Sequence, residues 1–198
     1  MKAKVNKVTI QVIEDDILAL TVAGLVHPTD TNLHVNPELA LKAGPVLQQV
    51  CNDIGWCDVG SAVITEAGET VFEKIIHAVG PRWGEGSERG KLANVTLQCL
   101  RLAEQNKLKS IAIPSISTGV LGYPVENCAK TMLAQIIDFT FDTPRYLRTI
   151  IVCLDNPPAY QIFKNEFLEQ PYKSVEIKLE RMRFNKKLVE AVNSIRSH

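Results

Sequence analysis

The chain has 198 residues, enough for one globular domain with a sizeable core, and 45% of them are hydrophobic while 22% are charged. Its 22 basic and 22 acidic side chains give a formal net charge of zero, which provides no overall attraction to nucleic acid or to an anionic membrane. No apolar run approaches the roughly 18 residues of a membrane span, and no N-terminal segment resembles a signal peptide, so we expect a soluble protein.

Short apolar segments alternate with segments of helical periodicity along the chain. Strands are predicted, in chain order, at 8–13, 22–26, 61–66, 71–79, 110–113 and 148–154. Helical segments are predicted at 17–20, 37–53 with a break at Gly44 and Pro45, 88–106, 124–139 and 157–168. Strands that alternate with helices of these lengths predict an α/β fold with a largely parallel sheet covered on both faces.

The last 28 residues differ in character from the rest of the chain. We place a boundary after residue 170, so that 1–170 form the main domain and 171–198 an extension with a strand at 174–179 and a basic amphipathic helix. The extension carries seven Lys/Arg and three Glu, a net charge of +4, whereas the main domain carries −4. An apolar helix stripe needs a covering surface, which favours docking on the main domain. Binding of a partner is the alternative, and the basic residues are too few to predict binding of nucleic acid.

The cysteines indicate the cellular environment. Their number is odd, no two form a CxxC pair, and most have apolar neighbours, where a free thiol packs as a small hydrophobic group. This pattern argues against a zinc site and favours a reducing, cytoplasmic location. The five are Cys51, Cys57, Cys99, Cys128 and Cys153.

The segment SISTGVLGYP, at 115–124, links a predicted strand to a predicted helix. In parallel α/β sheets, ligands bind beyond the carboxyl ends of strands, and this segment lies at one of those ends. Gly119 and Gly122 let backbone amides approach a ligand closely, and Pro124 suits the first helical position, which leaves the next amides free for an anion. The segment therefore predicts a phosphate cradle. A loop that merely turns the chain is the alternative.

Five segments, in order, resemble the signature motifs of the macro domain family. They are EDDI at 14–17, VHPTDTNL at 26–33, KIIHAVGPRW at 74–83, LKSIA at 108–112 and IPSISTGVLGYP at 113–124. The resemblance runs from Asn6 to Leu168, and the HPTDTN form of the second motif is most similar to the macro domain of a histone variant. It implies a three-layer α/β/α fold with a mixed, largely parallel central sheet, and a cleft that binds ADP-ribose.

The resemblance also implies a role for individual residues. Asp16 would accept a hydrogen bond from the adenine amino group, since a carboxylate only accepts, and the N–H of Ile17 would meet a ring nitrogen or a phosphate. The glycine loop would hold the diphosphate, Tyr123 would line the cleft beside it, and Asp155 and Asn156 would border the adenine. The implied ligand-binding residues are Asp16, Ile17, His27, Val35, Ser117, Thr118, Gly119, Val120, Leu121, Gly122, Tyr123, Asp155 and Asn156.

Several of these residues have a purely structural alternative. Asp15 is the expected N-cap of the stretch at 17–20, although Asp16 offers the same chemistry. His27 follows a strand directly and is compatible with a buried, hydrogen-bonded histidine. Tyr123 is compatible with the core, and Asp30 with turn chemistry, because aspartate side chains bond nearby backbone amides.

The departures from the family concern its catalytic residues. Hydrolytic members end the second motif with asparagine and follow it with a glycine-rich loop that carries an aspartate. Here Asp30 stands at the asparagine position and Asn36 at the aspartate position, and no glycine loop is present. An asparagine cannot act as a general base near neutral pH. Leu121 also replaces the aromatic residue that many members place in the diphosphate loop.

Three functions follow from these departures. The first is a module that binds ADP-ribose, or a protein modified with it, without turnover. The second is a hydrolase for ADP-ribosylated protein or an ADP-ribose ester such as the 1''-phosphate, in which burial raises the pKa of Asp30 so that it activates water, with His27 or His34 nearby. The third is an interaction protein with a degenerate pocket. None of the three requires a cofactor or a metal.

Overall fold

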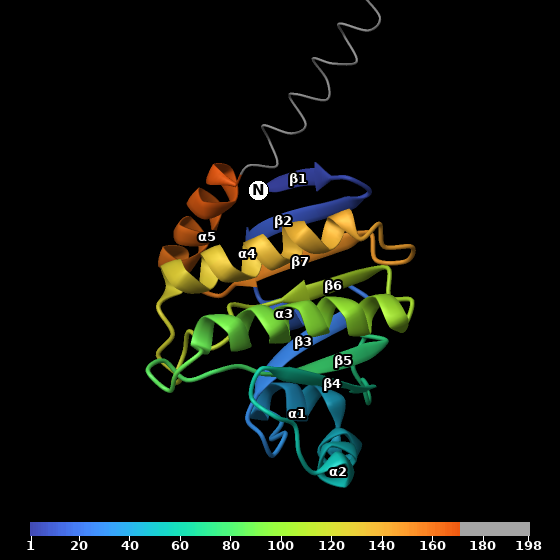
Figure 1. Ribbon diagram of the computed structural model, residues 1–198. Helices are drawn as coiled ribbons and strands as arrows, with labels where there is room; N and C mark the ends of the chain where they lie inside the picture. Colours follow the sequence, from blue (N-terminus) through green and yellow to red (C-terminus); the bar gives the residue numbers. More distant parts are fainter. Residues whose placement is uncertain (171–198) are drawn as a thin grey trace, which may run out of the picture. The chain divides into compact units, whose positions relative to one another are not determined.

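The structure, a computed structural model, describes residues 1–170, and its strands and helices alternate along the chain (Figure 1). The strands are β1 (Lys2–Val5), β2 (Val8–Glu14), β3 (Gly24–Thr29), β4 (Ser61–Glu66), β5 (Lys74–Val79), β6 (Ser110–Ile113) and β7 (Thr149–Leu154). The helices are the 3-10 turn η1 (Ile17–Ala19), α1 (Pro37–Ala43), α2 (Pro45–Ile54), α3 (Glu88–Gln105), α4 (Val125–Phe141) and α5 (Pro157–Glu169).

The strands of the described region form one sheet with the order β1-β2-β7-β6-β3-β5-β4. The inner pairs β2–β7, β7–β6, β6–β3 and β3–β5 are parallel. The outer pairs β1–β2 and β4–β5 are antiparallel. The predicted α/β class and the mixed, largely parallel sheet are therefore confirmed.

Helices cover both faces of this sheet, which gives the three predicted layers. In Figure 1, α3 and α4 lie side by side in front of the strands. Leu39 of α1 and Leu47 of α2 join a fully buried cluster with Leu25, Ile75 and Ala112 of three parallel strands. Because successive side chains of a strand point to opposite faces, the residues that alternate with these three face the layer formed by α3 and α4.

Most predicted elements occur within a few residues of their expected bounds. β4 and β6 have the predicted ends, and the helix break at Gly44 is confirmed by a φ of 74° there, a left-handed value that suits glycine. β5 begins at Lys74 rather than at residue 71, because the chain bends through residues 71–73. β3 begins two residues later than predicted and extends to Thr29.

The sequence does not predict β1. Its segment KAKV has only two apolar residues, too few to establish an alternating pattern. β1 lies at the edge of the sheet and pairs only with β2. Lysines on an edge strand discourage pairing with another chain, which explains a polar sequence in a strand.

β3 extends beyond its neighbour β6, and this difference opens the sheet. The two strands pair only at Gly24–Ile111 and Leu25–Ala112, whereas β3 continues to pair with β5 as far as Thr29. Pro28 is tolerated within β3 because no strand pairs with it on the β6 side, where its missing N–H would otherwise interrupt a ladder. The gap at the carboxyl ends of β3 and β6 is where ligands bind in such sheets.

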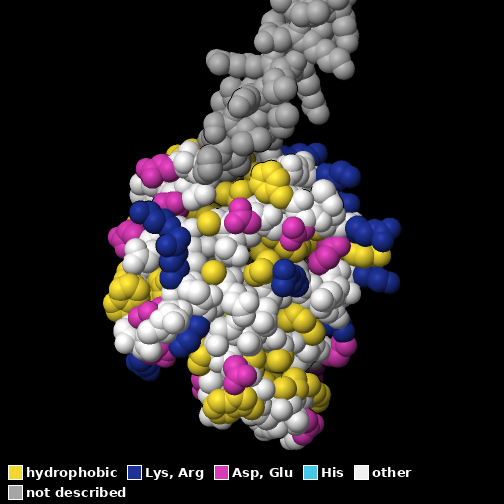
Figure 2. Space-filling model, viewed as in Figure 1, with side chains coloured by type: hydrophobic (Ala, Val, Ile, Leu, Met, Phe, Trp, Pro, Cys, Tyr) yellow, Lys and Arg dark blue, Asp and Glu magenta, His cyan; other side chains and the backbone are white. Residues whose placement is uncertain are grey.

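Three further points concern the surface, the helices and the C-terminus. Acidic and basic side chains are interspersed over the face seen in Figure 2, so this face presents no large area of a single charge sign. No helix within residues 1–170 is long and apolar enough to cross a membrane. The predicted extension at 171–198, with its strand, basic helix and docking, lies outside the described residues.

Candidate functional site

Two adjoining cavities lie at the carboxyl ends of β3, β6 and β7. The Asp16 cavity, of about 1070 Å³, is lined by Asp16 together with the residues that end β3 and those that follow β6 and β7. The Asp30 cavity, of about 490 Å³, begins where the first one ends and extends towards β5. Pro28, Ser115 and Gly119 line both cavities. Together they form one elongated cleft, with the SISTGVLGYP loop at its middle.

The loop presents backbone amides that nothing in the described protein uses. The N–H of Gly122 donates to the carbonyl of Gly119 (3.0 Å), and the N–H of Tyr123 donates to the carbonyl of Ser117 (3.0 Å). These two bonds close the turn, and a φ of +69° at Gly122 completes it. No described residue accepts a hydrogen bond from the three consecutive amides at 119–121. A run of unused amides beside a helix N-terminus is suited to an anion.

Gly119 faces open space. A Cβ placed on it would meet no atom of the described protein within 4 Å. Gly119 and Val120 are both exposed, and Leu121 is partly exposed above the Asp30 cavity. The sequence therefore correctly predicted free amides next to a position without a side chain, although the amide of Gly122 is used within the loop.

Ser117 is the strained residue of this loop. Its φ is +69°, a conformation that non-glycine residues adopt at a cost of about 1–3 kcal/mol. Its side chain lies against Gly80, where an added Cβ would come within 2.1 Å of the Ser117 Oγ. That oxygen is buried and has no hydrogen-bond partner among the described residues. The hydroxyls of Ser115 and Thr118, in contrast, bond to each other at 2.8 Å.

Asp16 lines the Asp16 cavity and directly precedes η1. Its Oδ1 accepts a hydrogen bond from the N–H of Leu18 (2.9 Å), so Asp16 itself is the N-cap. The expectation that Asp15 caps this turn is wrong, because the Oδ1 of Asp15 accepts from the N–H of Asp16 instead (2.8 Å). Asp16 is exposed, and one carboxylate oxygen keeps no partner within the described chain. Ile17 lines the same cavity.

Asp155 and Asn156 follow β7 and border the Asp16 cavity from the other side. The amide of Asn156 donates to Asp155 Oδ1 (2.8 Å), and its Oδ1 accepts from the N–H of Ala159 (2.9 Å) at the start of α5. Both residues are exposed. The structure therefore brings Asp155 and Asn156 to the same cavity as Asp16, as the sequence predicted.

Asp30 is held by His34 rather than buried. Its Oδ2 lies 2.7 Å from the Nδ1 of His34, and its Oδ1 accepts from the N–H groups of Asn32 (2.9 Å) and His34 (3.3 Å). Partial burial by itself raises the pKa of Asp30, but the hydrogen bonds from His34 and Asn32 outweigh it and keep the pKa below its ordinary value. The expectation that burial raises the pKa of Asp30 is therefore wrong. A carboxylate that is this weak a base is poorly suited to activate water near neutral pH.

Asn36 has a structural role. Its Oδ1 accepts from the N–H of Leu39 (2.8 Å), which makes Asn36 the N-cap of α1. Its backbone N–H donates to the Nε2 of His27 (3.3 Å), and the preceding residue Val35 donates to the side chain of Gln48 (2.8 Å). Asn36 lines the Asp16 cavity, but its side-chain acceptor is committed to the helix. Its assignment as a catalytic residue is therefore not supported.

His27 and His77 form a buried pair beneath the cleft. Their Nδ1 atoms are 3.2 Å apart, and the Nε2 of His77 lies 2.9 Å from the hydroxyl of Thr65. Because the N–H of Asn36 donates to His27 Nε2, the proton of His27 is on Nδ1 and points to His77, whose own proton is on Nε2. Burial lowers the pKa of His27 to about 4, although nearby Asp30 raises it, and burial with the neighbouring His27 lowers the pKa of His77 to about 3. Both rings are therefore neutral near pH 7.

Tyr123 lies under the loop rather than in the cleft. It is 2% exposed, and its ring packs edge-to-face on Trp83, with the ring centres 5.2 Å apart. Burial raises the pKa of Tyr123, and its hydroxyl bonds with Thr131. The expectation that Tyr123 lines the cleft is wrong, since the aromatic ring fills the core behind the loop at 117–122.

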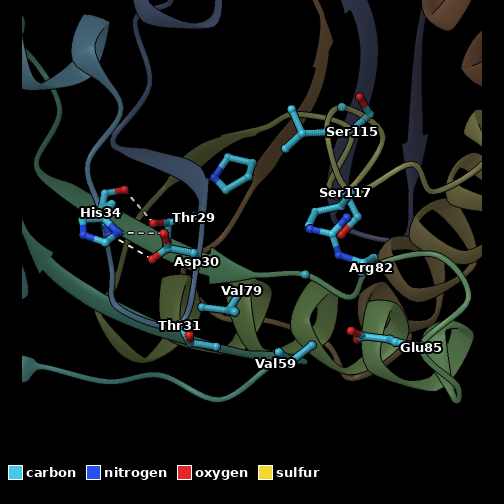
Figure 3. Close-up of a pocket in the computed structure, with 15 residues that line it drawn as sticks. Thr29, Asp30, Thr31, His34, Val59, Val79, Arg82, Glu85, Ser115 and Ser117 are labelled. Atoms are coloured by element: carbon cyan, nitrogen blue, oxygen red, sulfur yellow. Dashed lines mark hydrogen bonds and ion pairs between the residues drawn. The ribbon is translucent and has the colours of Figure 1, made fainter.

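Sequence reasoning missed several residues of the Asp30 cavity. Figure 3 shows Asp30 and His34 on one side of it and Ser117 with Arg82 on the other. Gly80 and Arg82 directly follow β5, so the rule that sites form beyond parallel strands could have identified them. Val59 reaches the cavity from the loop before β4, and no sequence signal indicated it.

Comparison with known proteins agrees with this architecture. The macro domain family model matches residues 26–132. The chain belongs to the macro domain family. This macro domain is 36% identical to an uncharacterised protein of Sulfurisphaera tokodaii, over 86% of this chain and 97% of that protein. It is 37% identical to an O-acetyl-ADP-ribose deacetylase of an Enterobacter species, over 78% of this chain and 93% of that protein.

Comparison with a solved structure supports the same family and the same fold. The macro domain superimposes on a variant of the Oceanobacillus iheyensis macrodomain with ADPR, with a TM-score of 0.78 and 30% sequence identity. The similarity covers 84% of this chain and 95% of that one. The predicted family and the predicted three-layer fold are therefore confirmed.

Proposed function

We propose that this macro domain binds ADP-ribose, free or attached to a protein. The three unused amides at 119–121, next to the open space in front of Gly119, carry this proposal. A diphosphate offers acceptors to several amides at once, and charge-assisted hydrogen bonds are about twice as strong as neutral ones. The similarity to the Oceanobacillus iheyensis macrodomain with ADPR supports the same ligand.

The shape of the cleft supports one orientation of the ligand. The adenine lies in the Asp16 cavity, where the unpaired oxygen of Asp16 accepts from its amino group and Asp155 and Asn156 border the ring. The diphosphate lies on the loop at 117–122, and the distal ribose enters the Asp30 cavity, which adjoins it at Gly119. Ile17 and His27, which line the Asp16 cavity, belong to the adenine side of this proposal. Val35 lines neither cavity and packs against two buried hydrophobic clusters, so its expected role in ligand binding is not supported.

Replacing Asp16 by serine tests the orientation. Serine retains a side-chain cap for Leu18 but removes the second carboxylate oxygen, so we expect the affinity for ADP-ribose to fall about tenfold while the fold is retained. Titration calorimetry should compare ADP-ribose with inosine diphosphate ribose, whose base lacks the amino group. The wild-type chain should prefer ADP-ribose, and Asp16→Ser should lose that preference. An unchanged preference would contradict the assignment of Asp16, and no heat with either ligand would contradict the function itself.

Hydrolysis of an ADP-ribose ester is the second candidate function. It is supported by the 37% identity to a protein named O-acetyl-ADP-ribose deacetylase. It is opposed by the commitment of Asn36 to α1 and by the lowered pKa of Asp30. An assay of acetate release from O-acetyl-ADP-ribose distinguishes the hydrolase from the binding module. It should be run on the wild-type chain and on Asp30→Ala. Turnover that disappears in Asp30→Ala would favour the hydrolase, whereas binding without turnover favours the binding module.

We also propose a reducing, cytoplasmic location. All five cysteines are free thiols, and all five are buried. Burial raises the pKa of Cys99 and Cys128 well above the ordinary thiol value, which keeps these thiols protonated and unreactive. Cysteines that serve only as small core residues are typical of compartments in which disulfides do not form.

A further inference from the structure

The Asp30 cavity has a second wall, formed by residues other than those around Asp30. Besides the residues around Asp30, its walls include Arg82, Glu85 and Val59, which lie past the diphosphate loop. With the adenine at Asp16 and the diphosphate at the loop, the distal ribose enters this cavity from the Gly119 side. A group attached to that ribose would then face Arg82. This inference rests on the proposed function and concerns what the attached group is.

The acidic groups of the Asp30 cavity already have partners. The carboxylate of Asp30 accepts hydrogen bonds from two backbone amides and lies against the ring of His34. Glu85 forms an ion pair with Lys91 at 3.2 Å. The backbone amides therefore offset part of the negative potential of Asp30, and Lys91 offsets part of that of Glu85.

The hydrogen-bond donors of the cavity, in contrast, are unused. Arg82 is exposed, and its guanidinium forms no hydrogen bond or ion pair with any described residue. On the same side in Figure 3 lies Ser117, whose buried hydroxyl oxygen has no partner in the described chain. Buried polar atoms without a partner are rare in folded proteins and indicate a missing ligand or water. A free guanidinium with unpaired donors suits a phosphate or a carboxylate.

We propose that Arg82 is a specificity-determining residue, which favours ADP-ribose ligands that carry an anionic group on the distal ribose. Arg82 lies on the wall opposite Asp30, so the group enters between a held carboxylate and a free guanidinium. The guanidinium supplies up to two parallel N–H donors to the anion. A neutral substituent gains nothing from this contact, because it cannot offset the desolvation of the guanidinium as a charged acceptor does.

Titration calorimetry with four ligands tests this proposal. They are ADP-ribose, ADP-ribose 1''-phosphate, and an O-succinyl ester of ADP-ribose, with O-acetyl-ADP-ribose as the neutral counterpart of the succinyl ester. The wild-type chain should bind the anionic ligands about tenfold more tightly than the neutral ones, a magnitude typical of one partly exposed charge-assisted contact. Arg82→Gln should remove this difference and Arg82→Lys should restore part of it. The phosphate and succinyl arms distinguish a compact anion from a tethered carboxylate.

Arg89 provides the matched control. It is an exposed arginine in the first turn of α3 and does not line the Asp30 cavity, so Arg89→Gln should leave all affinities unchanged. Equal binding of anionic and neutral ligands by the wild-type chain would overturn the role of Arg82 and leave ADP-ribose binding intact. An equal loss of affinity for every ligand in Arg82→Gln would also overturn this role, because it would indicate that Arg82 contacts the diphosphate. Failure of every ligand to bind would overturn the proposed function and this inference together.

Discussion

Gly119→Val should leave the protein folded and lower the affinity for ADP-ribose at least about 100-fold, because several charge-assisted hydrogen bonds depend on the same approach. The substitution costs little within the protein, since a Cβ at this position meets no described atom within 4 Å and the residue has no left-handed backbone conformation. The new methyl groups instead occupy the space in front of the loop amides. Binding should be measured by titration calorimetry and folding by thermal denaturation.

Gly90→Val is the matched control for this substitution. Gly90 is also exposed, a Cβ added to it would also meet no described atom within 4 Å, and it lies in α3 outside both cavities. The variant should keep both the wild-type affinity and the wild-type melting temperature within about 2 °C, since valine and glycine differ little in helix propensity. Wild-type affinity in Gly119→Val would show that the loop does not hold the ligand and would remove the main support for ADP-ribose binding.

Acid should destabilise the macro domain through the pair His27 and His77. Both have pKa values in the folded protein below the ordinary 6.5, at about 4 and about 3, so the unfolded chain takes up these protons first. The stability is therefore fully present above pH 6.5 and is lost as the pH falls towards 4. For each histidine the free energy of unfolding should decrease by up to about 1.4 kcal/mol per pH unit in this window.

Urea denaturation at several pH values between 7 and 4 measures this effect. His77→Gln removes one of the two titrating rings, and an amide can still bond to the hydroxyl of Thr65. The variant should be less stable at pH 7 but should lose stability less steeply on acidification, with about half the wild-type slope. Identical slopes in the two proteins would show that the histidine pair does not control the acid response.

The sequence was most informative where a pattern repeats or a motif has a fixed geometry. The apolar stripe of α3 and the short continuous run of β6 each identified an element, and the break at Gly44 followed from a glycine before a proline. β1 could not be found in this way because its pairing with β2 depends on a hairpin at the edge of the sheet rather than on its own composition.

The catalytic assignments show the limit of interpreting a site by position. The resemblance predicted that Asp30 and Asn36 stand at catalytic positions, but the chemistry of these residues depends on neighbours that a motif does not specify. His34 lies four residues from Asp30 and bonds to its carboxylate, and the N-terminus of α1 uses the side-chain acceptor of Asn36. Adjacency to the loop predicts Tyr123 in the cleft, whereas its side chain turns into the core to meet Trp83. The direction and the hydrogen-bond partners of each side chain, which a motif does not specify, therefore determine what Asp30, Asn36 and Tyr123 can do.

The unequal lengths of β3 and β6 have a consequence for how such proteins diversify. The cleft exists because β6 pairs with β3 at only two positions, whereas β3 continues alongside β5. The backbone of the sheet therefore creates the opening, and the connecting segments supply the side chains around it. The segment after β3 can therefore exchange glycines for the capping and ion-pairing residues found here without closing the entrance. The opening therefore depends on the lengths of two strands, whereas the groups that face it depend on the residues of the connecting segments.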